Sequence, residues 1–60
     1  MQIQTINYGA FRLIQTRNTY VLLDTETDTA VDLSRAQAIS LMTNKGDREE
    51  IARSLHWLLK

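Results

Sequence analysis

The sequence predicts an α+β protein in which a small antiparallel sheet of three to four strands precedes a hairpin of two helices. Two observations lead to this class. β-Branched and aromatic residues are concentrated before Leu33 and helix formers after it, and these residue types favour strands and helices respectively. Helix-capping patterns then occur twice in the second half. A sheet covered by two helices buries the apolar side of both layers.

The first two strands are predicted from apolar and β-branched runs that flank a turn residue. Residues 2–8 form the first, although their apolar positions do not alternate strictly. Gly9 supplies the turn, because glycine accepts a positive φ freely. Residues 10–16 form the second strand, with Phe11 and Leu13 on one face.

The third and fourth strands are separated by a polar turn. Residues 19–24 contain four consecutive apolar side chains, which predicts a central strand covered on both faces. Residues 25–28 supply turn chemistry, and residues 29–33 form a short fourth strand that returns along the third.

The first helix is predicted from about Arg35 to Thr43. Ser34 followed by Gln37 matches a capping box, in which each side chain satisfies a backbone N–H of the other. Gly46 is interpreted as the stop signal, since glycine is favoured just beyond a helix C-terminus.

The second helix is predicted over Asp47–Lys60, with Asp47 as its cap and Glu50 in the reciprocal position. At about 100° per residue, one stripe of this helix is apolar: Ile51, Ala52, Leu55, Leu58 and Leu59. Trp57, the single tryptophan, falls opposite this stripe among Glu50, Arg53 and Ser54. His56 is placed on the polar side, as an exposed histidine.

Length and composition narrow the function classes. A chain of 60 residues predicts a single domain over residues 1–60, and a domain of this size buries only about 60% of its unfolded surface. With no cysteine and one histidine, a disulfide and a thiolate or multi-histidine metal site are excluded. Stability then has to come from packing or self-association, so a homodimer is a possible state. No cofactor is predicted.

Charge and hydropathy narrow the partners and the location. Seven basic residues balance seven acidic ones, whereas nucleic-acid binders usually carry a clear basic excess. No apolar stretch approaches the ~20 residues of a membrane span, and the first residues lack the basic start and apolar run of a signal peptide. We expect a cytoplasmic protein that binds no membrane. Nucleic acid is not the partner that this charge balance favours.

The polar turn carries a motif with a possible metal chemistry. Asp24-Thr25-Glu26-Thr27 after an apolar strand resembles, over seven residues, the first motif of DnaQ-like 3′–5′ exonucleases. The resemblance implies that Asp24 and Glu26 bind catalytic metals. The further acidic residues and the general base of that family, on a much larger α/β fold, have no counterpart in the sequence. We therefore interpret the match as turn chemistry and predict that the protein is not an enzyme.

The acids Asp24, Glu26 and Asp28 also resemble the start of an EF-hand loop. Thr29 and Arg35 stand where that loop has its glycine and its closing glutamate, so no metal site is predicted. Two interpretations stay open: a solvated loop that discourages edge pairing, or an acidic patch that docks on a basic partner.

Trp57 and Arg53 are the leading functional candidates, because tryptophan and arginine are enriched among interface hot spots. Arg53 lies one turn before Trp57 and can stack on its ring. Three alternatives stay open for the surface that covers Trp57: the neighbouring helix or sheet edge, a second copy of the chain, or a foreign protein. The predicted partner-binding residues are Trp57, Arg53, Glu50, Asp24, Glu26 and Asp28.

The predicted function is a small non-enzymatic protein-binding module that inhibits or regulates a larger host or regulatory protein, a type familiar from phages and mobile elements. The alternative is a nucleic-acid-binding transcriptional regulator, with residues 44–46 as the turn of a helix-turn-helix. Its reading helix would carry Arg48, Arg53 and Lys60, but Glu49 and Glu50 stand in the first turn, where they would repel phosphates.

Overall fold

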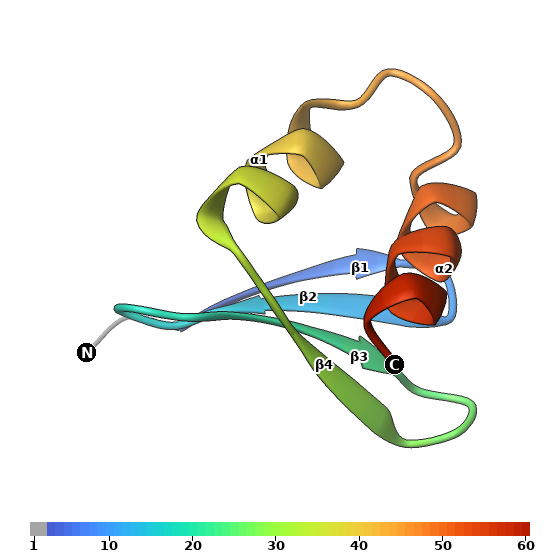
Figure 1. Cartoon of the computed structure of the whole chain (residues 1–60), viewed down its shortest axis with the longest axis horizontal. Helices are drawn as coiled ribbons and strands as arrows, with labels where there is room; N and C mark the ends of the chain where they lie inside the picture. Colours follow the sequence, from blue (N-terminus) through green and yellow to red (C-terminus); the bar gives the residue numbers. More distant parts are fainter. Residues whose placement is uncertain (1–2) are drawn as a thin grey trace.

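The computed structural model describes residues 3–60 as a four-stranded antiparallel sheet followed by two helices (Figure 1). The α+β class and its β-β-β-β-α-α order are thereby confirmed, while Gln2 of the predicted first strand lies outside the described residues. The sheet order is β1-β2-β3-β4, so each strand pairs with its neighbour in sequence. The elements are β1 (Gln4–Tyr8), β2 (Phe11–Gln15), β3 (Tyr20–Asp24), β4 (Thr29–Leu33), α1 (Arg35–Thr43) and α2 (Arg48–Leu59).

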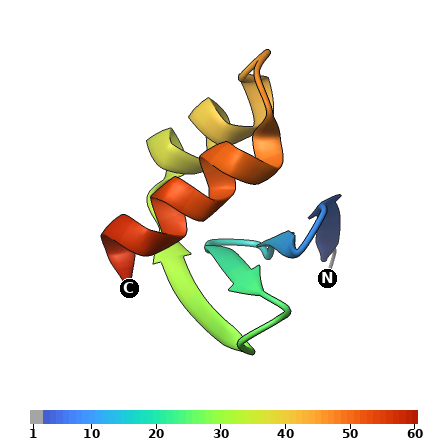
Figure 2. The same ribbon diagram turned by 90° about the vertical axis from the view of Figure 1, so that its right-hand side faces the viewer.

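Both helices lie on the same side of the sheet, and the core fills the space between the two layers (Figure 2). The strand register places Leu13 opposite Leu22, and Leu22 opposite Val31. Leu13 and Leu22 are fully buried, and Ala38 of α1 and Ala52 of α2 are buried against them. Small alanine side chains let both helices approach this row closely.

The other side of the sheet has no covering layer among residues 3–60, so the prediction that the third strand is covered on both faces is wrong (Figure 2). Val21 and Leu23 point to this outer side and are half-buried, with Ile14 paired to Val21. An antiparallel sheet can leave one face to solvent. The four-residue apolar run reflects cross-strand packing between these side chains rather than a second layer.

The helix starts follow the capping residues. The N–H of Gln37 donates to Ser34 Oγ at 3.1 Å, and the N–H of Ser34 donates to Gln37 Oε1 at 2.8 Å, so the predicted capping box is confirmed. Asp47 caps α2 by accepting from the N–H groups of Glu49 and Glu50.

The end of α1 at Thr43 agrees with the prediction, but its C-cap is Asn44 and not Gly46. The helix ends at Thr43, and the backbone of the following residue, Asn44, is extended (φ −67°, ψ 138°). Asn44 Oδ1 accepts a hydrogen bond from the N–H of Gly46 at 2.7 Å. This local side-chain bond offers the backbone an alternative to another helical turn.

The rotation of α2 about its axis also differs from the prediction. Its buried residues are Ala52 and His56, whereas Leu58 is 77% exposed and Leu59 is partly exposed. The predicted apolar stripe therefore wrongly included Leu58 and wrongly excluded His56. The inward position of His56 is stable because its Nε2 donates to the Thr29 carbonyl at 2.9 Å, which satisfies a polar group that burial would otherwise destabilise.

Candidate binding site

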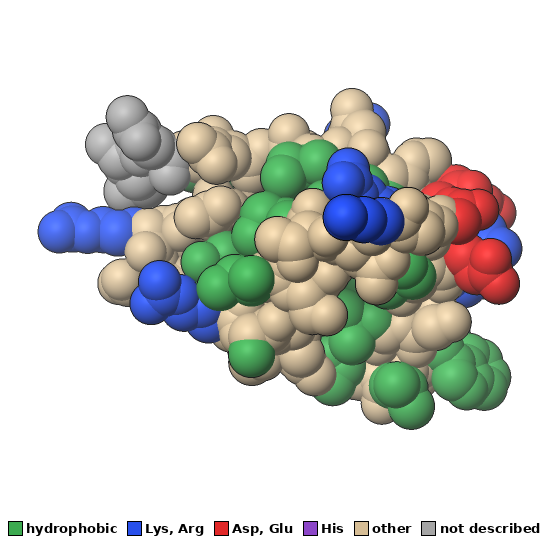
Figure 3. Space-filling model, turned by 90° about the horizontal axis from the view of Figure 1, so that it is seen from above, with side chains coloured by type: hydrophobic (Ala, Val, Ile, Leu, Met, Phe, Trp, Pro, Cys, Tyr) green, Lys and Arg blue, Asp and Glu red, His purple; other side chains and the backbone are tan. Residues whose placement is uncertain are grey.

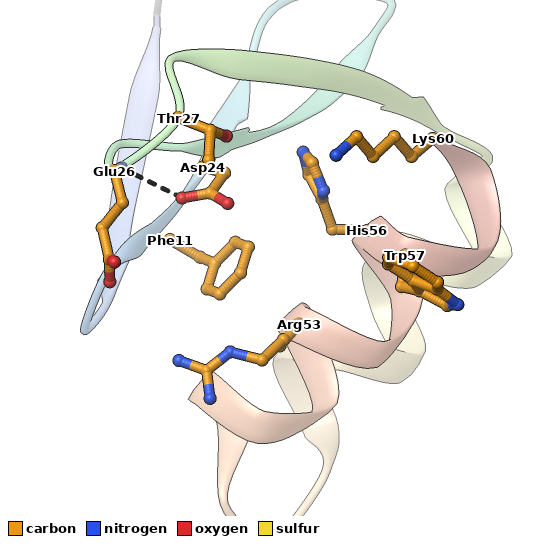
Figure 4. Close-up of a pocket in the computed structure, with 8 residues that line it drawn as sticks. All are labelled: Phe11, Asp24, Glu26, Thr27, Arg53, His56, Trp57 and Lys60. Carbon is orange, nitrogen blue, oxygen red and sulfur yellow. Dashed lines mark hydrogen bonds between the residues drawn. The ribbon is translucent and has the colours of Figure 1, made fainter.

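A cavity of about 250 Å³ lies between the β3–β4 loop and the C-terminal half of α2 (Figure 4). It brings together Asp24 and Glu26 from the loop with Arg53 and Trp57 from the helix, residues that stand about thirty positions apart in the sequence. These are four of the predicted partner-binding residues. The full lining is Phe11, Asp24, Glu26, Thr27, Arg53, His56, Trp57 and Lys60.

The two remaining predicted residues do not line this cavity. Glu50 is exposed in the first turn of α2, and its backbone N–H donates to Asp47. Asp28 is exposed at the tip of the β3–β4 loop with a φ of 56°. Aspartate tolerates this left-handed conformation better than most residues, so its position has a local conformational reason.

The β3–β4 loop is held in place by hydrogen bonds to the β1–β2 turn. The N–H and the hydroxyl of Thr25 both donate to the Ala10 carbonyl, at 2.9 and 2.7 Å. Within the loop, Asp24 Oδ1 accepts from the Glu26 N–H at 3.0 Å, and the Thr27 hydroxyl donates to Thr29. The acidic loop is therefore an ordered wall of the cavity.

Asp24 is the carboxylate whose ionisation the site alters. Desolvation raises the pKa of Asp24. Hydrogen bonds from Glu26 and Thr27, together with the nearby His56, lower the pKa by a larger amount. The net result is a pKa below the ordinary value of 3.8. Hydrogen bonding to the charged form explains this direction. Asp24 thus presents a negative charge to the cavity at neutral pH.

Phe11, His56 and Arg53 form the floor of the cavity. The ring centroids of Phe11 and His56 are 5.6 Å apart at an interplanar angle of 56°. The guanidinium of Arg53 lies 5.8 Å from the centre of the Phe11 ring and points away from Trp57 (Figure 4). The predicted stacking of Arg53 on Trp57 is therefore wrong. Arg53 instead reaches toward the sheet, where Phe11 offers an aromatic face.

Trp57 forms a ridge between two hollows. Its indole is 76% exposed and turns outward from the cavity, whereas the Lys60 side chain extends toward His56 (Figure 4). On the far side of this ridge, Trp57 and Leu58 line a shallow hollow of about 520 Å³ together with Arg53 and Ser54. The expected orientation of Trp57 away from the core is confirmed for the chain by itself.

Phe11, Thr27, His56 and Lys60 belong to this site but were not predicted. For Phe11 a signal existed, because the register of two short hairpins pairs it with Asp24. His56 had none, since its inward position depends on how far α2 is rotated against the sheet.

The geometry does not place a metal centre at the loop motif. Among residues 3–60, no three histidine or carboxylate side chains gather closely enough to hold a metal ion. The Asp24 and Glu26 carboxylates point to different places rather than to a common centre (Figure 4). What the site offers chemically is an apolar ridge beside a hollow that carries both negative and positive groups.

Comparisons with known proteins add no relative: no family model, no curated protein and no solved structure matches the chain. In the described part of the chain, neither helix has the length and apolar content needed to cross a membrane.

Proposed function

We propose that the protein is a small non-enzymatic protein-binding module that inhibits or regulates a larger protein. It would do so by inserting the outer face of α2 into a groove on that partner. The single observation that carries this proposal is the exposure of Trp57 and Leu58 side by side on α2. Large exposed apolar groups that gather in one place are typical of interaction surfaces.

The free energy of association that burial of Trp57 would supply is large for a chain of this size. A tryptophan buries about 150–250 Å², and about 25 cal/mol is gained per Å² of apolar surface removed from water. Covering the exposed part of Trp57 would therefore favour association by about 3–5 kcal/mol before the entropic costs of binding. Within the chain, Trp57 contributes little of this free energy to folding, because it is 76% exposed.

The charged groups around Trp57 suggest the chemistry of the partner surface. Arg53 and Lys60 come from α2 at separate places around the cavity, whereas Asp24 and Glu26 come from the end of β3 and the following loop (Figure 4). A partner with an apolar groove and a rim of mixed charge would complement this arrangement, and rim charges contribute to specificity and association rate more than to affinity. An acidic loop beside an apolar helix face also agrees with the docking interpretation of the acidic patch.

The outer face of α2 supports this mode better than DNA reading. Its residues are Glu50, Arg53, Ser54, Trp57 and Leu58, of which one is basic. The side chain of Glu49, in the first turn, is engaged by the β1–β2 turn. A helix-turn-helix protein needs this first turn free to enter the major groove.

The proposal also includes three expectations from the sequence: an origin in a phage or mobile element, a cytoplasmic location and a possible homodimer. The cysteine-free sequence agrees with a reducing compartment. A second copy is the competing cover for Trp57, and sedimentation at two protein concentrations separates it from a foreign partner.

The test uses tagged wild-type protein, Trp57→Ala, and Ile39→Ala as a matched control. Ile39 is also an exposed apolar residue, but it lies on α1 outside the site. A protein that the tagged wild-type chain captures should be purified, and its affinity for the wild type and for each of the two variants should be measured. We expect Trp57→Ala to weaken binding at least about 30-fold, as a hot-spot residue does, and Ile39→Ala to leave it unchanged.

The stability of Trp57→Ala decides whether this test is valid. An exposed residue should change the free energy of unfolding by no more than about 0.5 kcal/mol. The fluorescence of the single tryptophan should be that of a solvated indole in the free protein and should shift to the blue in the complex. A blue-shifted emission in dilute free protein, or unfolding of the variant, would remove the basis of the proposal.

A further inference from the structure

A second hollow, here called the basic cleft, lies at the opposite end of the sheet from the Trp57 site. It has a volume of about 580 Å³ and is lined by Arg17, Asn18, Tyr20, Leu33, Ser34 and Arg35. Small-molecule sites typically measure about 300–1,000 Å³. The basic cleft is therefore large enough to hold a small ligand.

The basic cleft is built by the strand register. Tyr20 pairs with Leu33, so the β2–β3 turn and the junction of β4 with α1 lie side by side. The turn is held by hydrogen bonds between Thr16 and Thr19, including the Thr16 N–H to the Thr19 carbonyl at 3.0 Å. Arg17 at the tip of this turn and Arg35 at the start of α1 thus flank the same hollow.

The charge of the basic cleft is one-sided. Its lining includes two exposed arginines, Arg17 and Arg35, and no acidic residue of the described residues 3–60. Asp32 is close in sequence, but strand residues alternate between faces, and its partner Val21 lies on the outer face of the sheet. Seen from the helix side, the end of the molecule opposite the red acidic side chains shows blue cationic side chains and no red ones, while further blue side chains lie at the centre and beside the red ones (Figure 3).

Helix stability does not explain the position of Arg35. It is the first residue of α1, which has no acidic residue in its first turn. A cation at this end opposes the helix dipole. The Ser34 Oγ accepts from the Gln37 N–H, which leaves its O–H free to donate. The polar groups that can meet a ligand are therefore this hydroxyl, the two guanidiniums, the Asn18 amide and the half-buried Tyr20.

We propose that the basic cleft binds the phosphate group of a small ligand. Guanidinium groups match phosphate oxygens with paired, charge-assisted hydrogen bonds. Tyr20 supplies an aromatic surface on which a nucleobase can stack. Free pyrophosphate and a mononucleotide share this chemistry, and they differ in whether Tyr20 takes part. The proposal is independent of the Trp57 site, because no residue lines both hollows.

The test is a titration of the full chain, in low-salt buffer free of phosphate, with pyrophosphate, adenosine monophosphate and adenosine. Backbone amide NMR signals report where each probe binds. We expect saturable shifts at residues 16–20 and 33–36 with both phosphate probes. Adenosine should cause none, and added salt should weaken binding. Equal binding by adenosine, or shifts that do not saturate, would overturn the proposal.

Matched charge variants separate a defined site from general attraction. Arg17→Gln and Arg35→Gln should each weaken binding roughly tenfold. Arg12→Gln makes the same charge change on the outer face of the sheet and should leave the affinity unchanged. An equal loss in all three would refute the site. Folding is checked by the melting temperature, which Arg35→Gln should leave unchanged or raise.

The Tyr20→Leu variant distinguishes the two ligand sources. If the ligand is a nucleotide, wild-type protein binds adenosine monophosphate more tightly than pyrophosphate, and Tyr20→Leu removes that preference. If it is pyrophosphate, the variant leaves its affinity unchanged. Affinity that rises with the length of a single-stranded oligonucleotide would instead assign the cleft to nucleic acid and overturn a small ligand.

Discussion

The carboxylate of Glu49 accepts a hydrogen bond from the backbone N–H of Ala10, with Oε2 2.7 Å from the nitrogen. The two residues are 39 positions apart, so this bond joins the first turn of α2 to the β1–β2 turn. Ala10 also accepts through its carbonyl from Thr25. The turn at Ala10 therefore links α2 with the β3–β4 loop, which are the two walls of the candidate site.

Replacement of Glu49 by alanine should lower the free energy of unfolding by about 1–2 kcal/mol, because a charge-assisted hydrogen bond is lost. Glu49→Gln keeps an acceptor oxygen and should cost less. Glu50→Ala is the matched control, since it removes the same favourable charge from the first turn of α2. Urea unfolding at neutral pH measures all three. Equal losses for Glu49→Ala and Glu50→Ala would contradict a role for the bond to Ala10.

Gly9→Ala should be more damaging in the wild type than in a Glu49→Ala background. Gly9 has a φ of +63°, and a Cβ there would overlap the Glu49 carboxylate. The left-handed conformation costs an L-residue about 1–2 kcal/mol in either background. In the wild type the clash also displaces Glu49, which raises the total to about 2–3 kcal/mol. A double-mutant cycle measures this coupling, and additive effects would show that the two residues do not touch.

His56→Ala should destabilise the fold by about 2–3 kcal/mol, since it opens a cavity beside Phe11 and leaves the Thr29 carbonyl without its donor. A carbonyl only accepts, so Nε2 carries the hydrogen. His56→Gln retains an N–H donor and should recover part of the loss, whereas His56→Phe fills the space but donates nothing. Thermal unfolding compares these variants with the outward-facing Ser54→Ala. A wild-type-like His56→Ala would mean that the inward position of the ring is not realised.

Asp28→Val should destabilise the protein by about 1–2 kcal/mol, because a β-branched residue resists the φ of 56° at this position. Asp28→Asn should be close to neutral, and Asp28→Gly should be neutral or stabilising by less than about 1 kcal/mol. Thermal melts of the three variants give the ranking. Valine tolerated as well as asparagine would rule out the left-handed conformation.

The Asp24 carboxylate should contribute a pH-dependent part of the stability. Its pKa is lower in the folded chain than the ordinary value of 3.8, so the folded state binds the proton less readily than the unfolded state. The contribution is complete above 3.8 and is lost as the pH falls through the folded pKa. Urea unfolding of wild type and Asp24→Asn from neutral pH into the acid range should show a difference that shrinks with acidification. A constant difference would contradict the hydrogen bonds to Glu26 and Thr27.

Local chemistry made much of the fold predictable. The pair Ser34 and Gln37 marked the start of α1, and Asp47 that of α2, because a cap is specified by residues three positions apart. The strands were predictable because each is a short run of apolar and β-branched residues between turn residues, which is also a local pattern. The predicted end of α1 at Thr43 was also correct, but the interpretation of Gly46 as the stop signal was wrong, since Asn44 is the C-cap and its side chain accepts from the Gly46 N–H.

Features that depend on how the layers meet were not predictable from local patterns. The apolar stripe of α2 is broad enough to allow more than one rotation, and the rotation adopted buries His56 rather than Leu58. The Glu49 bond to Ala10 and the Arg53 contact with Phe11 likewise join residues distant in sequence. For the site, the sequence indicated Trp57, Arg53, Asp24 and Glu26, but only the packing of α2 on the sheet shows that they share one cavity.

The strand order β1-β2-β3-β4 has a kinetic consequence. Each hairpin closes between segments adjacent in sequence, so little loop entropy opposes each step. Proteins dominated by such short-range pairings fold quickly, and a chain without proline has no slow prolyl isomerisation. Refolding after a rapid dilution from urea should therefore follow a single exponential that is complete within about a second.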